Sequence, residues 1–158
     1  FSSASASYTK SFSPALDEDD YSQFMIAISG KTNGEDETPT IIFSDSASNV
    51  YAQGQYNNRT TIAILTISDS APLLLMNATG LGSANTSYTS LITFTINNKM
   101  GYITGIMETL NGNSVHSETK YFEVASSDLS SIEIAYTGSG EYQADSQFAV
   151  WGFKNAWV

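Results

Sequence analysis

The sequence predicts an all-β protein, a β-sandwich or jelly roll of about ten antiparallel strands. Apolar and polar residues alternate with a period of two in short segments along the whole chain, which is the pattern of half-buried strands. Gly, Asn, Asp and Ser separate these segments and are typical of turns. Ser, Thr and Asn supply 51 residues against 22 charged ones, and these three side chains disfavour helix interiors.

The segments follow one another at the short spacing that is typical of sandwiches and barrels. In chain order we expect strands near Tyr8–Phe12, Gln23–Gly30, Thr40–Ser44, Asn49–Gly54, Thr61–Ser68, Leu73–Asn77, Leu91–Ile96, Gly101–Leu110, Asn113–Val124, Ser131–Tyr136 and Gln147–Phe153. The second of these places Phe24, Ile26 and Ile28 on one face. Thr61–Ser68 is apolar on both faces, so we expect it to lie centrally between two layers.

The dipeptide Asn111-Gly112 is the strongest turn signal, because both central residues of a type I′ turn need a positive φ. We expect a two-residue hairpin turn there. That register sets His116 opposite Met107, in the middle of a strand.

The chain has the length of one ordinary domain. We expect a flexible N-terminal arm over residues 1–7 and a single domain over residues 8–158. The arm lacks a basic region and an apolar region, so it does not resemble a signal peptide. Asp17–Asp20 and Lys31–Thr38 are expected to be exposed connections.

The formal net charge of −10 comes from 16 acidic and 6 basic residues. This balance argues against partners whose affinity depends on neutralising phosphates, so we expect neither nucleic acid nor membrane as a partner. The chain has no cysteine, which removes disulfides, thiolate nucleophiles and cysteine zinc sites. The longest apolar run, Pro72–Met76, is far too short to span a bilayer.

Catalytic candidates are few. His116 is the only histidine and hence the only base for a Ser-His-Asp arrangement, but a structural or surface role is the simpler interpretation. Five glutamates in or beside predicted strands are candidates for a glycosidase pair, yet no spacing selects two of them. They are Glu108, Glu118, Glu123, Glu133 and Glu141. We therefore expect no catalytic residue and no enzyme activity.

Metal and cofactor sites are not expected either. Asp17–Asp20 and Glu35–Glu37 offer oxygen ligands for Ca²⁺ but lack the alternating spacing and the turn glycine of an EF-hand loop. Gly80-Leu81-Gly82 precedes neither a lysine nor a helix, so it does not form a phosphate cradle.

Aromatic residues are the more promising contact groups, with nine Tyr, eight Phe and two Trp. Tyrosine combines a flat apolar ring with a polar tip, which suits both subunit contacts and sugar stacking. Tyr51, Tyr56 and Tyr142 are therefore candidate contacts for a glycan or a partner. The alternative is that such rings cap the edges of the core.

The two tryptophans receive different interpretations. Trp151 alternates with its neighbours in the last predicted strand and is expected to be structural. Trp157 and Val158 would be costly to expose, so they are candidate contacts with another subunit or a capsid. An unstructured terminus is the competing interpretation. N-x-Ser/Thr sequons at Asn58, Asn77 and Asn85 support secretion only weakly in a chain this rich in these residues.

The C-terminal segment Ser130–Lys154 has a characteristic order of features. A strand of the form Ser-Ile-x-Ile is followed by a Gly/Ser turn, an aromatic-plus-small stretch ending in Ser, and a strand ending Trp-Gly-Phe-Lys. This order resembles that of tailed-phage virion proteins of the fibre, spike and decoration type, over about 25 of the 158 residues. The chain departs from the usual form at Ala144–Ser146 and at Trp151. The resemblance implies a TNF-like or related jelly roll, often trimeric, and it carries over no catalytic residue.

The resemblance also implies that Ser131–Tyr136 and Gln147–Phe153 form a long hairpin that closes the sheet. The leading hypothesis is a structural bacteriophage protein on the virion surface, either a capsid decoration protein or a fibre or spike component. It predicts a homo-oligomer, with a trimer favoured, and contacts with virion proteins such as the major capsid protein. The alternative is a carbohydrate- or receptor-binding module for a host glycan. An enzyme such as a glycan hydrolase would require a carboxylate pair in a cleft.

Overall fold

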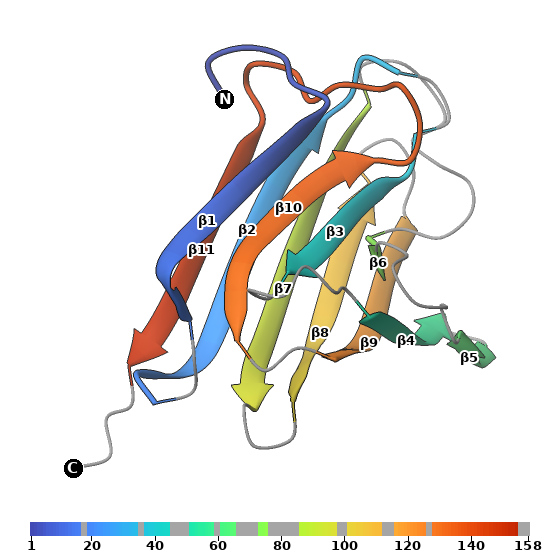
Figure 1. Cartoon of the computed structure of the whole chain (residues 1–158). Coiled ribbons are helices and arrows are strands. Elements are labelled where there is room, and N and C mark those ends of the chain that lie inside the picture. Colours follow the sequence, from blue (N-terminus) through green and yellow to red (C-terminus); the bar gives the residue numbers. More distant parts are fainter. Residues whose placement is uncertain are drawn as a thin grey trace.

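The computed structural model describes residues 1–16, 19–34, 37–44, 51–58, 61–65, 73–75, 86–97, 101–111, 116–125 and 128–154. These residues form eleven β-strands and no helix (Figure 1). The strands are β1 (Ser7–Leu16), β2 (Tyr21–Lys31), β3 (Pro39–Ser44), β4 (Tyr51–Asn58), β5 (Thr61–Leu65), β6 (Leu73–Leu74), β7 (Ser87–Asn97), β8 (Tyr102–Asn111), β9 (His116–Ala125), β10 (Leu129–Tyr136) and β11 (Gln147–Lys154). The described part of the chain thus contains no helix that is long and apolar enough to cross a bilayer.

The described strands form two antiparallel sheets packed face to face (Figure 1). One sheet has four strands in the order β1-β10-β3-β6, and the other has seven in the order β11-β2-β7-β8-β9-β4-β5. Both sheets contribute side chains to one hydrophobic core. The prediction of an all-β sandwich is confirmed.

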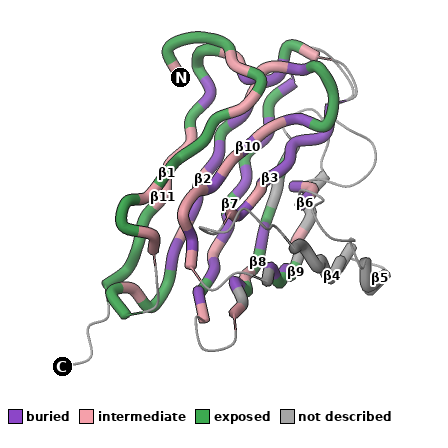
Figure 2. The backbone as a smooth tube through the Cα atoms, in the orientation of Figure 1, coloured by how far each residue is buried: buried purple, intermediate pink, exposed green. Residues whose placement is uncertain are grey.

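The core follows from the alternation seen in the sequence (Figure 2). Phenylalanines from the two sheets stack in it: Phe43 of β3 lies 5.2 Å from Phe94 and 5.3 Å from Phe122, measured between ring centroids. Phe24 stacks on Phe94 at 5.1 Å. The predicted inward faces of β2, β7 and β10 are all buried; they comprise Phe24, Ile26, Ile28, Ile92, Phe94, Ile96, Ile132, Ile134 and Tyr136.

The β8–β9 hairpin is present, but its register differs from the predicted one. Asn111 lies opposite His116, and Met107 lies opposite Lys120. Four residues therefore connect the strands in place of two, and the turn itself lies outside the described residues. The prediction that His116 faces Met107 is wrong.

Burial explains this register. The observed register sets Ile103 opposite Val124 and Gly105 opposite Phe122, so the apolar residues of both strands share the inner face. A two-residue turn would instead place the charged residue Lys120 opposite the buried Ile103. Gly105 gives Phe122 its space, since an added Cβ would lie 2.7 Å from that ring and 2.3 Å from the carbonyl oxygen of Thr93.

The predicted C-terminal hairpin does not form, because β10 and β11 belong to different sheets. β10 is paired on both sides, with β1 and β3. The chain therefore crosses from one layer to the other through residues 137–146, and β11 pairs with β2. Sequence adjacency suggested a hairpin, but both edges of β10 are already occupied.

Thr61–Leu65 forms β5, at the end of the seven-stranded sheet. Among the described residues it pairs with β4 alone, through a tight hairpin that sets Asn58 opposite Thr61. The expectation that this segment is covered by a layer on each face stays a prediction, since the order of strands within one sheet does not test it. Apolar residues on both faces indicate cover on both faces, but the number of hydrogen-bonded neighbours is a separate property of the sheet.

The first seven residues pack on the sandwich and do not extend from it as an arm. The Phe1 ring stacks on Tyr8 at 3.9 Å and meets Tyr142 edge to face at 5.6 Å. The backbone of Ser5 exchanges two hydrogen bonds with Tyr142. Apolar contacts and backbone pairing thus hold a segment whose Ser/Ala composition indicated flexibility.

Candidate functional site

The contact residues expected from the sequence do not form one site. Trp157 and Val158 lie outside the described residues. Tyr51 and Tyr56 lie on β4, where they pair with Ala125 and Lys120 of β9. Only the backbone of β4 is described, so the sequence hypothesis about these two rings remains a prediction.

Tyr142 is buried and presents no surface to a partner of the folded chain. Its side chain is 0% exposed, and its hydroxyl lies 2.7 Å from that of Tyr88. Its ring also packs on Tyr136, with centroids 4.4 Å apart. The expectation of a surface contact is wrong for Tyr142, because the segment after β10 turns this ring into the space between the sheets.

The three buried tyrosines are held in the neutral state. Burial, followed by the nearby Tyr142 and Tyr136, raises the pKa of Tyr88 well above its ordinary value of 10.0. Burial likewise raises the pKa of Tyr142 and of Tyr136. The neutral phenols of Tyr88 and Tyr142 form a hydrogen-bonded pair within the core.

Glu37 is a buried anchor that the sequence did not reveal. Its carboxylate accepts a hydrogen bond from the Gly138 N–H at 2.8 Å and another from the Gly140 N–H at 2.9 Å. Thr32 and Thr38, in the same predicted exposed connection, are also buried. Glycine suits positions 138 and 140 because an added Cβ at either would lie within 3.0 Å of the Glu37 side chain.

The features of the C-terminal segment Ser130–Lys154 that were singled out in the sequence therefore lie at positions that stabilise the fold. Its Gly/Ser turn binds Glu37, and its aromatic residue is the buried Tyr142. Ser146 is buried, and its Oγ accepts a hydrogen bond from the Lys31 N–H. Gly152 lies under the ring of Tyr21, which an added Cβ would approach to 2.6 Å.

Two of the candidate glutamates, Glu108 and Glu123, lie too far apart to form a glycosidase pair. Glu108 and Glu123 are both exposed on the outer face of the seven-stranded sheet. Glu108 lies opposite Thr119, four residues before Glu123, which is roughly 13 Å along a strand. Catalytic carboxylates of glycosidases are about 5–9.5 Å apart. His116 begins β9, and its side chain lies outside the described residues.

Within the described residues, no group of three or more His, Cys, Asp or Glu side chains has a geometry that could hold a metal ion. Asp19 and Asp20 are exposed in the turn before β2. Their partners in the acidic run, Asp17 and Glu18, lie outside the described residues.

The outer face of the seven-stranded sheet carries the most pronounced surface feature of the described chain. Six large hydrophobic side chains are exposed on it by 38–53%. We call this set the platform; it consists of Leu91, Ile106, Leu110, Tyr121, Trp151 and Phe153. Trp151, expected to be structural, is 45% exposed. The inner positions of β11 are instead occupied by Phe148 and Val150.

Strand register aligns the centre of the platform. Trp151 lies opposite Met25, which lies opposite Thr93, and the same row continues through Ile106 to Tyr121. Four inter-strand steps separate the two aromatic ends, or about 19 Å. The row thus crosses five strands, with apolar side chains on either side of the hydroxyl-bearing residue Thr93.

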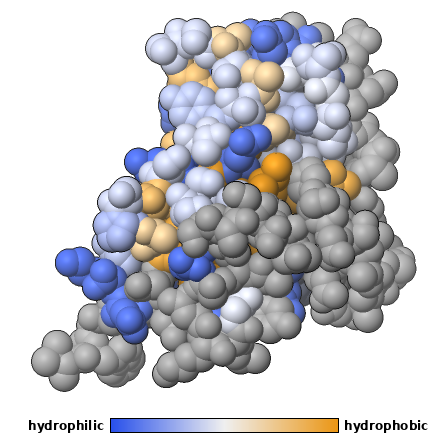
Figure 3. Space-filling view, viewed as in Figure 1, coloured by the Kyte–Doolittle hydropathy of each residue, from blue (hydrophilic) through white to orange (hydrophobic). Residues whose placement is uncertain are grey.

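The opposite face of the sandwich differs in character. The outer positions of β10 are Ser131, Glu133 and Ala135. Figure 3 shows this side, where the coloured surface over β1 and β10 is mostly hydrophilic or neutral and hydrophobic residues form only small separate groups. Exposed apolar groups are therefore concentrated on the platform side.

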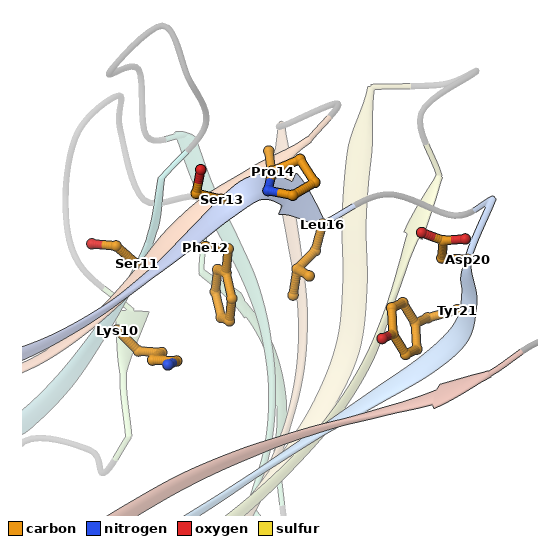
Figure 4. A pocket seen from close by; sticks show the side chains of 9 residues that line it. Lys10, Ser11, Phe12, Ser13, Pro14, Leu16, Asp20 and Tyr21 are labelled. Carbon is orange, nitrogen blue, oxygen red and sulfur yellow. The ribbon is translucent and has the colours of Figure 1, made fainter.

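A pocket of about 410 Å³ lies where β1 and the start of β2 meet. Phe12 and Leu16 of β1 and Tyr21 of β2 point into it, with Lys10 and Asp20 at its ends (Figure 4). These apolar side chains are only partly buried. The two layers are thus incompletely closed along this edge.

No family model matches the chain, and no curated protein matches it. Among solved structures, the chain is similar to a polysaccharide lyase family 18 protein described as aly-SJ02 r-CATD. The identity is 9% over 92% of this chain and 79% of the other, with a TM-score of 0.31. A similarity of this extent carries no conclusion about function.

Proposed function

We propose that the chain is a structural protein of a bacteriophage virion that acts by assembly and catalyses no reaction. The observation that carries this proposal is the platform, which exposes six large apolar side chains on the outer face of the seven-stranded sheet. Contiguous exposed apolar groups on a soluble domain mark contact surfaces. Covering them contributes about 25 cal/mol per Å² of apolar area removed from water.

The virion assignment rests on the resemblance of Ser130–Lys154 to fibre, spike and decoration proteins. In this proposal the chain lies on the virion surface and its platform contacts a neighbouring virion subunit, such as the major capsid protein. The resemblance favours a homotrimer. The row from Trp151 to Tyr121 contains no charged residue, which limits electrostatic repulsion along it in a chain of net charge −10. Glu108 lies beside this row, opposite Leu91.

Particle incorporation tests this proposal. We expect quantitative mass spectrometry of purified virions that encode the chain to find it at a fixed copy number. The double variant Ile106→Ser/Tyr121→Ser should be lost from particles, while Tyr8→Ser, which changes an exposed aromatic side chain of the other sheet, should be retained. Absence of the wild-type chain from particles would overturn the proposal.

A glycan-binding module is the second candidate, and it is supported by the aromatic ends of the platform row. Tyr121 and Trp151 offer half-exposed rings on a flat strand surface, and hydroxyl groups of Thr93 and Thr104 lie on the same outer face. Aromatic rings with polar neighbours suit sugar stacking.

Glycan-array binding distinguishes this candidate. The wild-type chain should bind a defined glycan class, and Trp151→Ala and Tyr121→Ala should each weaken binding at least tenfold, about 1.4 kcal/mol. Tyr8→Ala serves as the control with unchanged binding. An array without signal excludes the glycans it contains.

A further inference from the structure

The strand β11 is an edge of the seven-stranded sheet with a long unpaired side. Among the described residues it has a hydrogen-bonded neighbour on one side only, the strand β2. Its eight residues pair with β2 without a register shift as far as Phe153. Such an edge presents a row of backbone N–H and C=O groups that can pair with another strand.

The composition of β11 offers little protection against pairing. The segment Gln147–Lys154 contains no proline, and its only charged residue is the last one. Trp151 and Phe153 are exposed by 45% and 48%. Natural sheets protect such edges with charges directed inward, prolines, bulges or very short strands.

The edge strands of the four-stranded sheet do carry these protective features. β1 has Lys10 opposite the buried Ile132, a proline at position 14, and a register irregularity between Ser11 and Leu16. At the other edge, β6 has only two residues. Compared with these two edges, β11 is regular and apolar, and it is longer than β5, the five-residue strand at the other end of its own sheet. Its edge is therefore suited to a partner strand.

Charge indicates what kind of partner fits. The strands β1, β2 and β11 contain three lysines, Lys10, Lys31 and Lys154, and no acidic residue, in a chain with a net charge of −10. Repulsion between two copies of an acidic protein is therefore low along the strands of this edge. The nearest acidic residues in the sequence, Asp17–Asp20 and Asp145, lie in the connections that flank the strands.

We propose that β11 pairs antiparallel with β11 of a second copy of this chain, which joins the two seven-stranded sheets into one. This inference rests on the proposed function, since it names one contact of the proposed homo-oligomer. A two-fold axis at Trp151 sets the two Trp151 residues opposite each other and Phe153 opposite Ala149. On the inner face it sets Val150 opposite Gly152, beside the half-closed edge that Tyr21 borders. Large residues thus face small ones, apart from the central aromatic pair.

The contact is isologous, so each copy uses the same residues. By itself it gives a dimer, and in a trimeric protein it would link two trimers. Charge substitutions at the axis provide a direct test. In a pair of identical variants two like charges would meet at the axis and repel, whereas a positive and a negative variant would attract each other.

Sedimentation equilibrium of the full chain measures the association. We expect the wild type to form a species of twice the mass of its Trp151→Lys or Trp151→Glu variant, each judged folded by near-ultraviolet circular dichroism. An equimolar mixture of the two variants should recover the wild-type mass. Thr95→Lys is the matched control, since Thr95 is exposed on the same outer face but is not part of the platform and lies two strands from the edge, and it should keep the wild-type mass.

Hydrogen exchange provides a readout that needs no substitution. Amides of β11 in the wild type should lose protection on dilution, while those of β7 keep it. A wild type that stays at 17.0 kDa at high concentration, or a mixture that fails to recover the mass, would overturn the inference. Particle incorporation of Ile106→Ser/Tyr121→Ser tests the platform separately, so either proposal can fail alone.

Discussion

Glu37 and Tyr142 have structural roles that the chemistry of their side chains alone does not indicate. Glu37 is an acidic residue in an acidic run, yet it is buried and accepts two backbone hydrogen bonds from the segment between β10 and β11. Tyr142 lies in a turn-like sequence, yet it is part of the core. Glu37 binds the backbone of residues 137–146, and Tyr142 belongs to this segment, which crosses from one sheet to the other.

Replacement of Glu37 tests this anchor. In Glu37→Gln an NH₂ group replaces one carboxylate oxygen. This group cannot accept a hydrogen bond from the backbone N–H that it faces, so a buried hydrogen bond is lost. We predict a decrease in the free energy of unfolding of about 1–3 kcal/mol, measured by urea denaturation. Glu108→Gln, at an exposed position, should change it by less than about 0.5 kcal/mol. Equal stability of the two variants would contradict the anchoring role.

The buried tyrosines predict a stability loss in alkali. Their pKa values are raised in the folded chain above the ordinary 10.0, so above pH 10.0 the unfolded chain loses protons that the folded chain keeps. Their contribution is complete below pH 10.0 and falls as the pH rises further. Urea unfolding at a series of alkaline pH values should show this decline, and the Tyr88→Phe/Tyr142→Phe variant should show a smaller slope. An unchanged slope would exclude these two residues as its source.

At the scale of elements, alternation located the strands because burial acts on every second residue of a strand. The inward faces of β2, β7 and β10 were predictable in this way. Register and pairing were not, since they depend on which strand edges are free and which apolar residues must face each other. The four-residue connection of β8 and β9 and the edge position of β5 are examples.

Two glycines of the β7–β8 hairpin are required for different physical reasons, one for space and one for its backbone conformation. Gly105 needs space, because an added Cβ would meet backbone at 2.3 Å, while Gly101 needs its positive φ of 72° and has free space around it. We predict that Gly105→Ala costs about 1–3 kcal/mol and Gly101→Ala about 1–2 kcal/mol in thermal or urea unfolding. Asparagine should recover stability at position 101 only, because it tolerates a positive φ. Recovery at position 105 would refute the steric explanation.

At the scale of the whole molecule, the proposed contact surface was only partly predictable. Aromatic richness and the expectation of no catalytic residue pointed to a contact protein, but the residues named for contact were not those of the platform. Trp151 and Tyr121 are 30 residues apart in the sequence and share a row only because β2, β7 and β8 lie between their strands. Sheet order therefore creates a surface that no local pattern contains.

The central claim is that the platform faces a neighbouring subunit in an assembled virion. Photo-cross-linking from a benzophenone amino acid tests it most directly, placed in one variant at Ile106 and in another at Glu133, on the outer face of the opposite sheet. We predict cross-links to a virion protein from position 106 and none from position 133 in intact particles. Cross-links from position 133 alone would contradict the claim.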